Sequence, residues 1–102
     1  MGCLPITNAQ VPDEQLLAGS AWLIKGDYQR AVESLSLAIT RNNADDQLFI
    51  KRGIALLQLR DTDAAIADFS EANLINPQVA DLWLAKAYTQ TGDTEKAFEI
   101  LR

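Results

Sequence analysis

The chain has 102 residues, of which 48% are hydrophobic, and it carries a net charge of −5 with a pI near 4.5. This composition favours one folded domain over a disordered chain. Nucleic-acid binding depends largely on Lys and Arg side chains, so 9 basic residues against 14 acidic ones argue against such a partner. An anionic membrane surface is disfavoured for the same reason, and no apolar run approaches the ~20 residues of a membrane span.

The sequence offers few groups for catalysis or for metal binding. It contains no histidine, which is the commonest general base and metal ligand, and a single cysteine, Cys3, which excludes an internal disulfide. There is no glycine-rich phosphate loop and no CxxC or HExxH motif. The acidic pairs Asp45-Asp46 and Asp61-x-Asp63 precede predicted helices, where carboxylates cap the first turn. We therefore expect no catalytic residue, no cofactor and no metal site.

Residues 1–11 carry no charge and show no helical period. Three interpretations stay open for them. They are a flexible leader, or the end of a secretory signal whose small-x-small cleavage site finishes at Ala9, or a lipobox remnant in which Cys3 is lipidated. The first interpretation places the protein in the cytoplasm by default, and the other two place it in the periplasm or the cell envelope.

The rest of the chain is predicted to be helical, because its apolar residues recur at three- and four-residue steps and no segment alternates like a strand. Asp27, Asp61 and Asp93 each precede such a pattern and are expected to cap a helix. Gly26 and Gly92 stand where a left-handed residue ends the preceding helix. The six helices are expected at roughly 13–25, 28–41, 46–59, 62–75, 79–90 and 94–102.

The sequence repeats itself at an offset of about 34 residues, a period typical of paired-helix repeats. At this offset Ala31 falls on Ala65, and Leu35 falls on Phe69. A third unit contains Ala97, which lies 32 residues after Ala65 instead of 34. This unit therefore lacks two residues, either in the turn before it or within its first helix. The alanines leave room for neighbouring helices to approach closely, and short connections make successive helices antiparallel.

This pattern resembles the tetratricopeptide repeat (TPR), which has the form W-x2-L-G-x2-Y followed by alanine, phenylalanine, alanine and proline within one repeat. The second unit carries most of the motif, namely Phe49, Gly53, Leu56, Ala65, Phe69, Ala72 and Pro77. The resemblance implies an all-α, right-handed solenoid of antiparallel helix pairs, with repeats at 12–45, 46–77 and 78–102, the last one truncated.

In TPR proteins the first helix of each repeat lines a concave groove that receives a partner segment. The resemblance therefore implies a protein or peptide partner held against the first helices. The implied groove residues are Leu16, Ser20, Leu23, Gln47, Ile50, Ile54, Leu57, Gln58, Lys86 and Gln90, with Ile24, Leu82 and Thr89 on the same faces. The alternative is that Ile50, Ile54 and Leu57 belong to the core and that the polar groove residues are ordinary solvated surface.

One subtype of the family captures chaperone C-termini with a carboxylate clamp of Lys, Asn and Arg. The matching places here hold Leu16, Ser20, Ile50 and Ile54, so the clamp is absent. The sequence instead favours an apolar or amphipathic helical segment as the partner.

The last predicted helix is only about two turns long, and nothing downstream covers Phe98 and Leu101. A terminal repeat normally needs a polar outer face. We interpret the chain either as a fragment of a longer repeat protein or as a homo-oligomer that associates through these two residues. A binding scaffold and an assembly module are thus the two functions that the sequence supports.

Overall fold

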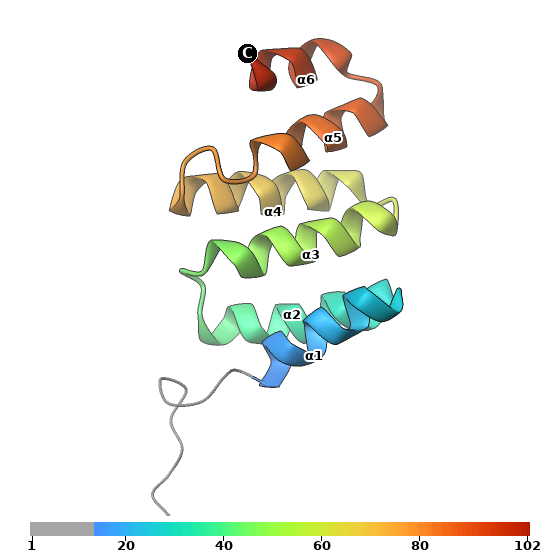
Figure 1. The fold of residues 1–102 in the computed structure, drawn as a ribbon, viewed down its shortest axis with the longest axis vertical. Coiled ribbons are helices and arrows are strands. Elements are labelled where there is room, and N and C mark those ends of the chain that lie inside the picture. The colour runs from blue at the N-terminus through green and yellow to red at the C-terminus, as the bar shows by residue number, and fades with distance from the viewer. Residues whose placement is uncertain (1–13) are drawn as a thin grey trace, which may run out of the picture.

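The computed structural model describes residues 14–102, so the interpretations of residues 1–11 lie outside the described part of the chain. The described residues form six helices and no strand, which are α1 (Glu14–Lys25), α2 (Tyr28–Arg41), α3 (Asp46–Gln58), α4 (Thr62–Ile75), α5 (Asp81–Thr91) and α6 (Thr94–Leu101). All six predicted helices are confirmed. They stack in chain order along the long axis of the molecule (Figure 1). None of them is long and apolar enough to cross a membrane.

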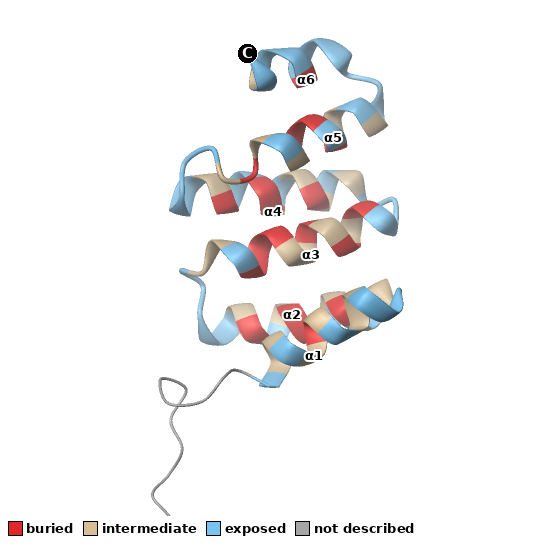
Figure 2. Ribbon diagram, viewed as in Figure 1, coloured by how far each residue is buried: buried red, intermediate tan, exposed pale blue. Residues whose placement is uncertain are grey.

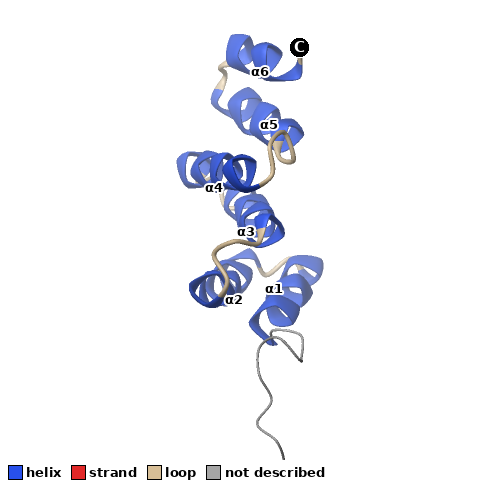
Figure 3. Cartoon of the chain, turned by 90° about the vertical axis from the view of Figure 1, so that its left-hand side faces the viewer, coloured by secondary structure: helices blue, strands red, loops and turns tan. Residues whose placement is uncertain are grey.

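The helices lie in two layers. The view in Figure 3 separates α1, α3 and α5, the first helices of the three pairs, from α2 and α4 on the opposite side. Each second helix begins at the predicted aspartate. The side chains of Asp27, Asp61 and Asp93 accept hydrogen bonds from backbone N–H groups three residues later, at 3.2, 3.4 and 3.2 Å. These bonds satisfy N–H groups that the first helical turn leaves unpaired.

Left-handed residues turn the chain from the first helix to the second in each pair. Gly26 and Gly92 do so with φ of 86° and 89°, as the sequence predicted. The equivalent place in the second pair holds Arg60, at φ 68°. A residue with a Cβ is strained in this conformation.

Two apolar clusters hold the stack together, and most of their residues come from α2, α3, α4 and α5 (Figure 2). Alanines that are 0% exposed, among them Ala31 and Ala65, let the helices approach closely. Gly53 shows how tight the approach is, because an added Cβ would lie 2.5 Å from the Phe69 ring. By contrast, α1 buries only Gly19 and α6 buries only Ala97.

The third pair is shorter because its first helix is shorter. α5 has 11 residues where α3 has 13, whereas the connection at 76–80 is no shorter than the one at 42–45. α5 also lacks the usual side-chain cap. Asn73 of α4 replaces that cap, because its Oδ1 accepts from the Ala80 N–H and its Nδ2 donates to Asp81 Oδ1, each at 2.8 Å.

Candidate protein-binding surface

We call the side of the stack formed by α1, α3 and α5 the first-helix surface. The predicted groove residues are all on these three helices, but they differ in exposure. Gln47, Gln58 and Lys86 are exposed, and five others are half-buried, namely Leu16, Ser20, Leu23, Ile54 and Gln90. The first-helix surface therefore combines partly exposed apolar groups with polar side chains that reach solvent.

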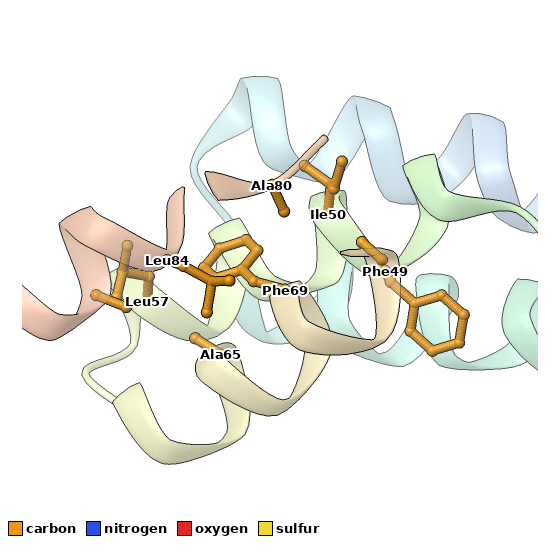
Figure 4. Close-up of a cluster of buried hydrophobic side chains, with 9 residues drawn as sticks. Phe49, Ile50, Leu57, Ala65, Phe69, Ala80 and Leu84 are labelled. Atoms are coloured by element: carbon orange, nitrogen blue, oxygen red, sulfur yellow. The ribbon is translucent and has the colours of Figure 1, made fainter. Parts of the chain in front are cut away.

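Ile50 and Leu57 are buried, with 7% and 5% of their surface exposed. Both belong to the cluster that joins α3, α4 and α5, and Ile50 lies close to Ala80 at the start of α5 (Figure 4). They are buried in the cluster that α3 shares with α4, with Ala80 and with the inner face of α5. The core interpretation therefore fits these two residues, and they leave almost no side-chain area for a partner. Ile54 packs against the same cluster from its edge and stays half-exposed.

Two polar members of the set form hydrogen bonds between helices. Lys51 Nζ donates to Ser20 Oγ at 3.2 Å, which joins α3 to α1. Gln90 Nε2 donates to Thr62 Oγ1 at 2.9 Å and to the Leu57 carbonyl at 3.4 Å. Ser20 and Gln90 thus help to position the first helices relative to their neighbours, and both remain partly exposed on the first-helix surface.

A hollow of about 280 Å³ lies where α5 meets the end of α6. Its lining residues are Leu82, Trp83, Ala85, Lys86, Thr89 and Leu101. Leu82 is 68% exposed, and Lys86 Nζ lies 5.0 Å from the centre of the Trp83 ring. The hollow joins predicted groove positions to Leu101, which the sequence had assigned to self-association. Trp83 and Ala85 were not among the predicted residues, because the two residues missing from the third repeat prevented assignment of the residues in the first half of α5 to a helix face.

The open end of the stack is apolar. Phe98 and Leu101 of α6 are 71% and 56% exposed, although Ala97 on the same helix is buried. The two exposed side chains are those that the sequence predicted to be uncovered. Within the described part of the chain, the equivalent positions of α2 and α4 are much less exposed than Phe98 and Leu101.

A buried ion pair joins the two helices of the second pair, α3 and α4, and the sequence analysis missed it. Arg52 of α3 donates from Nε and Nη2 to the Asp68 carboxylate of α4 at 2.8 and 2.7 Å, and from Nη1 to Ser36 Oγ of α2 at 3.2 Å. The hydrogen bond to Asp68 raises the pKa of Arg52, against the opposing effect of burial. The pair has a structural role, because Asp68 is only 5% exposed.

The described residues hold no group of three or more His, Cys, Asp or Glu side chains that could bind a metal ion. Two cations, Lys51 and Lys86, lie on the first helices among the predicted groove residues. Lys51 is engaged in its hydrogen bond to Ser20, and the exposed Lys86 can orient a bound chain. What the surface offers chemically is apolar contact and hydrogen bonding.

Comparison with known proteins agrees with this architecture. Two tetratricopeptide repeat models match residues 47–79 and 79–102, which together make up more than half of the chain. A relative in Arabidopsis thaliana, the probable UDP-N-acetylglucosamine–peptide N-acetylglucosaminyltransferase SEC, is 33% identical over 88 residues. That match covers 83% of this chain and only 9% of the relative's length.

Solved structures with a similar fold include the TPR2B-domain–pHsp70 complex of yeast Sti1, at 29% identity and a TM-score of 0.84 over 86% of this chain and 72% of that one. MamA of AMB-1 has 26% identity and a TM-score of 0.79 over 92% and 59%. The second TPR of Spaghetti (RPAP3), bound to an HSP90 peptide, has 24% identity and a TM-score of 0.80 over 93% and 94%, which supports the fold alone. The all-α solenoid described above belongs to the tetratricopeptide repeat family.

Proposed function

We propose that this chain is a non-catalytic scaffold that binds an apolar or amphipathic segment of a partner protein on its first-helix surface. The observation that carries the proposal is the row of half-exposed apolar side chains, Leu16, Leu23 and Ile54, on adjacent first helices. Membership of a repeat family, and the TPR2B–pHsp70 complex among similar structures, support a peptide as the kind of partner.

The exposed polar residues define how such a segment would bind. Gln47 and Gln58 stand at opposite ends of α3, on either side of Ile54, and can exchange hydrogen bonds with a partner. A helical segment with apolar residues at three- and four-residue steps would place its apolar face on Leu16, Leu23 and Ile54. Ile50 and Leu57 lie beneath this surface and would hold α3 in position rather than touch the partner.

The partner that we propose is not an anionic chain terminus. The places that hold the carboxylate clamp in chaperone-binding members carry Leu16, Ser20, Ile50 and Ile54 here, and none of these side chains is a cation. Lys51, the nearest cation to Ser20, donates a hydrogen bond to it. These residues favour an apolar ligand over a carboxylate, although similar folds occur in complexes with chaperone peptides.

The test is a binding titration with a helical peptide that carries leucine at three- and four-residue steps, beside a peptide of the same composition without the stripe. Ile54→Lys should weaken binding of the striped peptide about tenfold or more, because it places a charge in the apolar row. Leu37→Lys is the matched control, since Leu37 is 52% exposed on α2, outside the first-helix surface. Because Ile54 also touches the core, circular dichroism must show native helix content.

A folded Ile54→Lys protein that binds the striped peptide as tightly as the parent chain would contradict the proposal. So would equal affinity for the two peptides. If Ile54→Lys loses helix content, Gln47→Ala and Gln58→Ala take its place, because both side chains are exposed and neither contributes to the core.

The second candidate function is assembly through the open end, which the 71% and 56% exposure of Phe98 and Leu101 favours. Exposed apolar patches of this kind commonly mark interaction surfaces. The double change Phe98→Ser and Leu101→Ser should turn a concentration-dependent oligomer into a monomer in sedimentation velocity. Peptide binding on the first-helix surface should stay unchanged. A parent chain that is monomeric at high concentration would exclude this function.

A further inference from the structure

The joint between the first two helix pairs shows how one repeat packs on the repeat before it. On the α3 side, Leu48 and Ala55 are 2% and 0% exposed and belong to the same cluster as α2. On the α2 side, Leu35 is fully buried and Val32 packs against that cluster. Each repeat therefore has an entry face on its first helix, which packs on the previous repeat, and an exit face on its second helix.

The entry face of the first repeat has no such cover among the described residues. Ala21 stands one full repeat before Ala55 and is exposed, although Ala55 is completely buried. Leu17, which stands one repeat before Lys51, is 57% exposed. A hollow of about 270 Å³ opens on this side of α1, lined by Ala18, Ala21, Trp22 and Lys25.

The exit face of the third repeat is exposed in the same way. The alignment that superposes Ala97 on Ala31 places Phe98 at the position of Val32 and Leu101 at the position of Leu35. Val32 and Leu35 are packed or buried, whereas Phe98 and Leu101 are 71% and 56% exposed. Among residues 14–102, the entry face at one end of the stack and the exit face at the other are thus both exposed.

We propose that the exit face on α6 binds the entry face on α1 of a second copy, head to tail. This inference rests on the proposed self-association and names the surface that receives the open end. The chain itself contains the template, because entry faces already pack on exit faces at its two internal joints. Continuity with those joints selects a second copy over an unrelated partner.

The contacts at the first joint can be mapped onto the equivalent residues of α6 in one copy and α1 in the next, and they bring an apolar side chain to a hollow. In that joint Lys51 of the entry face contacts Ser20 of the preceding repeat at 3.2 Å. The equivalent residues in the head-to-tail contact are Leu17 of one copy and Lys86 of the other. Lys86 lines the 280 Å³ hollow beside α6 together with Leu82 and Leu101, so the Leu17 side chain enters an apolar hollow.

The charges at the two ends are also complementary. Leu59 lies beside Gln29 in the first joint, where both line one hollow, and their equivalents are Lys25 and Glu95. Arg52 contacts Ser36, and the equivalent of Ser36 is Arg102, the final residue of the chain. Arg102 then meets Ala18 and extends toward Glu14, which is one helical turn earlier on α1. The head-to-tail contact pairs a cation with an anion at each side of the apolar centre.

Lys96 also falls near this contact, since it occupies the position of Arg30. The ammonium of Lys96 lies 5.3 Å from the centre of the Tyr88 ring, much as the Arg30 guanidinium lies 4.9 Å from the Trp22 ring. Lys25 has a similar contact with the Trp22 ring, at 5.7 Å, and the mapped contact places the Glu95 carboxylate on the side of Lys25 that faces the second copy. Because the two surfaces differ, the contact is heterologous and extends into open chains rather than a closed dimer.

The test uses two variants of the 102-residue chain, each of which blocks one surface. Ala21→Arg blocks the entry face and Phe98→Glu blocks the exit face, and both positions are exposed. In sedimentation velocity the parent chain should form species larger than dimers as concentration rises, and each variant alone should be a monomer. An equimolar mixture of the two variants should form a single dimer, because one intact entry face then meets one intact exit face.

A parent chain that stays monomeric would overturn self-association itself. A different outcome would separate the two ideas. If the parent chain associates, and if Phe98→Glu abolishes this association whereas Ala21→Arg does not, then self-association is supported but the head-to-tail contact is wrong. As a second measurement that leaves the core untouched, Lys25→Glu should weaken association several-fold, and the added change Glu95→Lys should restore it. Failure of the double variant to recover any affinity would count against the proposed pairing.

Discussion

The two internal joints of the stack connect the same kinds of helices by different chemistry. Across the joint between α2 and α3, Arg52 donates a hydrogen bond to Ser36 at 3.2 Å, and a bidentate ion pair with Asp68 of α4, at 2.7 and 2.8 Å, holds the Arg52 guanidinium in position for it. Between α4 and α5 the joint has an aromatic stack instead, with the rings of Phe69 and Trp83 6.0 Å apart. The amide of Asn73 adds hydrogen bonds to the start of α5.

This difference teaches which parts of the repeat are constrained. The capping aspartates and the buried alanines recur in all three pairs, because they form the turn and let the helices of a pair approach each other. The contacts between pairs are free to vary, provided that the surfaces fit. At the second joint α5 is two residues shorter than α3, and the rings of Phe69 and Trp83 stack across that joint.

The largest expected effect comes from breaking the second joint at Phe69, which is 0% exposed. Phe69→Ala should lower the free energy of unfolding by about 3–5 kcal/mol, because it leaves a cavity beside Trp83 and Gly53. Urea denaturation followed by circular dichroism measures this. The control Leu37→Ala, on the exposed side of α2, should change stability by less than about 0.5 kcal/mol. A loss at Phe69 of less than about 1 kcal/mol, below the usual range for a buried aromatic ring, would mean that the stack does not hold this joint.

A somewhat smaller loss is expected from Asp68→Ala, which removes the α4 partner of Arg52 and so affects the first joint only through the Arg52 bond to Ser36. Removal of one partner of a buried ion pair leaves the other charge unpaired, and about a quarter of the Arg52 side chain is in contact with solvent. We therefore expect a cost of about 2–3 kcal/mol rather than the full range for a buried pair. Ser36→Ala, which removes one 3.2 Å bond, should cost only about 0.5–1.5 kcal/mol.

Equal effects of the Asp68 and Ser36 changes would contradict the view that the ion pair between α3 and α4 contributes more to stability than the Ser36 bond across the first joint. The contribution of the pair should also be constant through neutral pH. The pKa of Arg52 is raised from an already high value, so its guanidinium loses its proton only at strongly alkaline pH.

The change Asn73→Ala sharpens the comparison further, because it removes a contact that only the second joint has. The loss of two 2.8 Å hydrogen bonds should cost about 1–2 kcal/mol. Hydrogen exchange should show faster exchange in α5 and α6 than in α1–α3. Asn76→Ala is the control, since its 3.3 Å bond to Asp46 is exposed and its removal should have little effect. Uniformly faster exchange along the whole chain would show that Asn73 does not act locally.

The smallest effect is a gain in stability. Arg60 holds φ at 68°, where the other two pairs have Gly26 and Gly92. Arg60→Gly should raise the free energy of unfolding by about 0.5–1 kcal/mol, because glycine adopts this conformation without strain. Leu59→Gly, one residue earlier at φ −79°, should instead lower stability. Thermal unfolding of the two variants compares them, and a shift of both in the same direction would argue against a role for the left-handed turn.

Local signals in the sequence were sufficient to predict the helices of this fold. The caps at Asp27, Asp61 and Asp93 and the left-handed glycines depend only on neighbouring residues, so their positions could be read directly. The repeat offset supplied the pairing of helices. For this reason the all-α solenoid and its six helices agree with the structure.

The candidate site was harder to predict, because it depends on how the pairs pack. Ile50 is buried in a cluster that includes Ala80, just before α5, and the place of this segment depends on the two residues missing from the third repeat. The contact between Arg52 and Asp68 joins two different helices and lies beyond the reach of a helical period. Gln90 was assigned to the groove from its place on the first helix of the third unit, yet it donates to Thr62 of the preceding repeat. None of these contacts leaves a local pattern in the sequence.

The central claim is that a partner segment binds on the first-helix surface, and NMR chemical-shift mapping with the striped helical peptide tests it most directly. We predict shifts in the amides of Leu16, Ile54 and Lys86, with none at Leu37 of α2 or Leu74 of α4. Saturable shifts on the second helices, with an unchanged first-helix surface, would contradict the account.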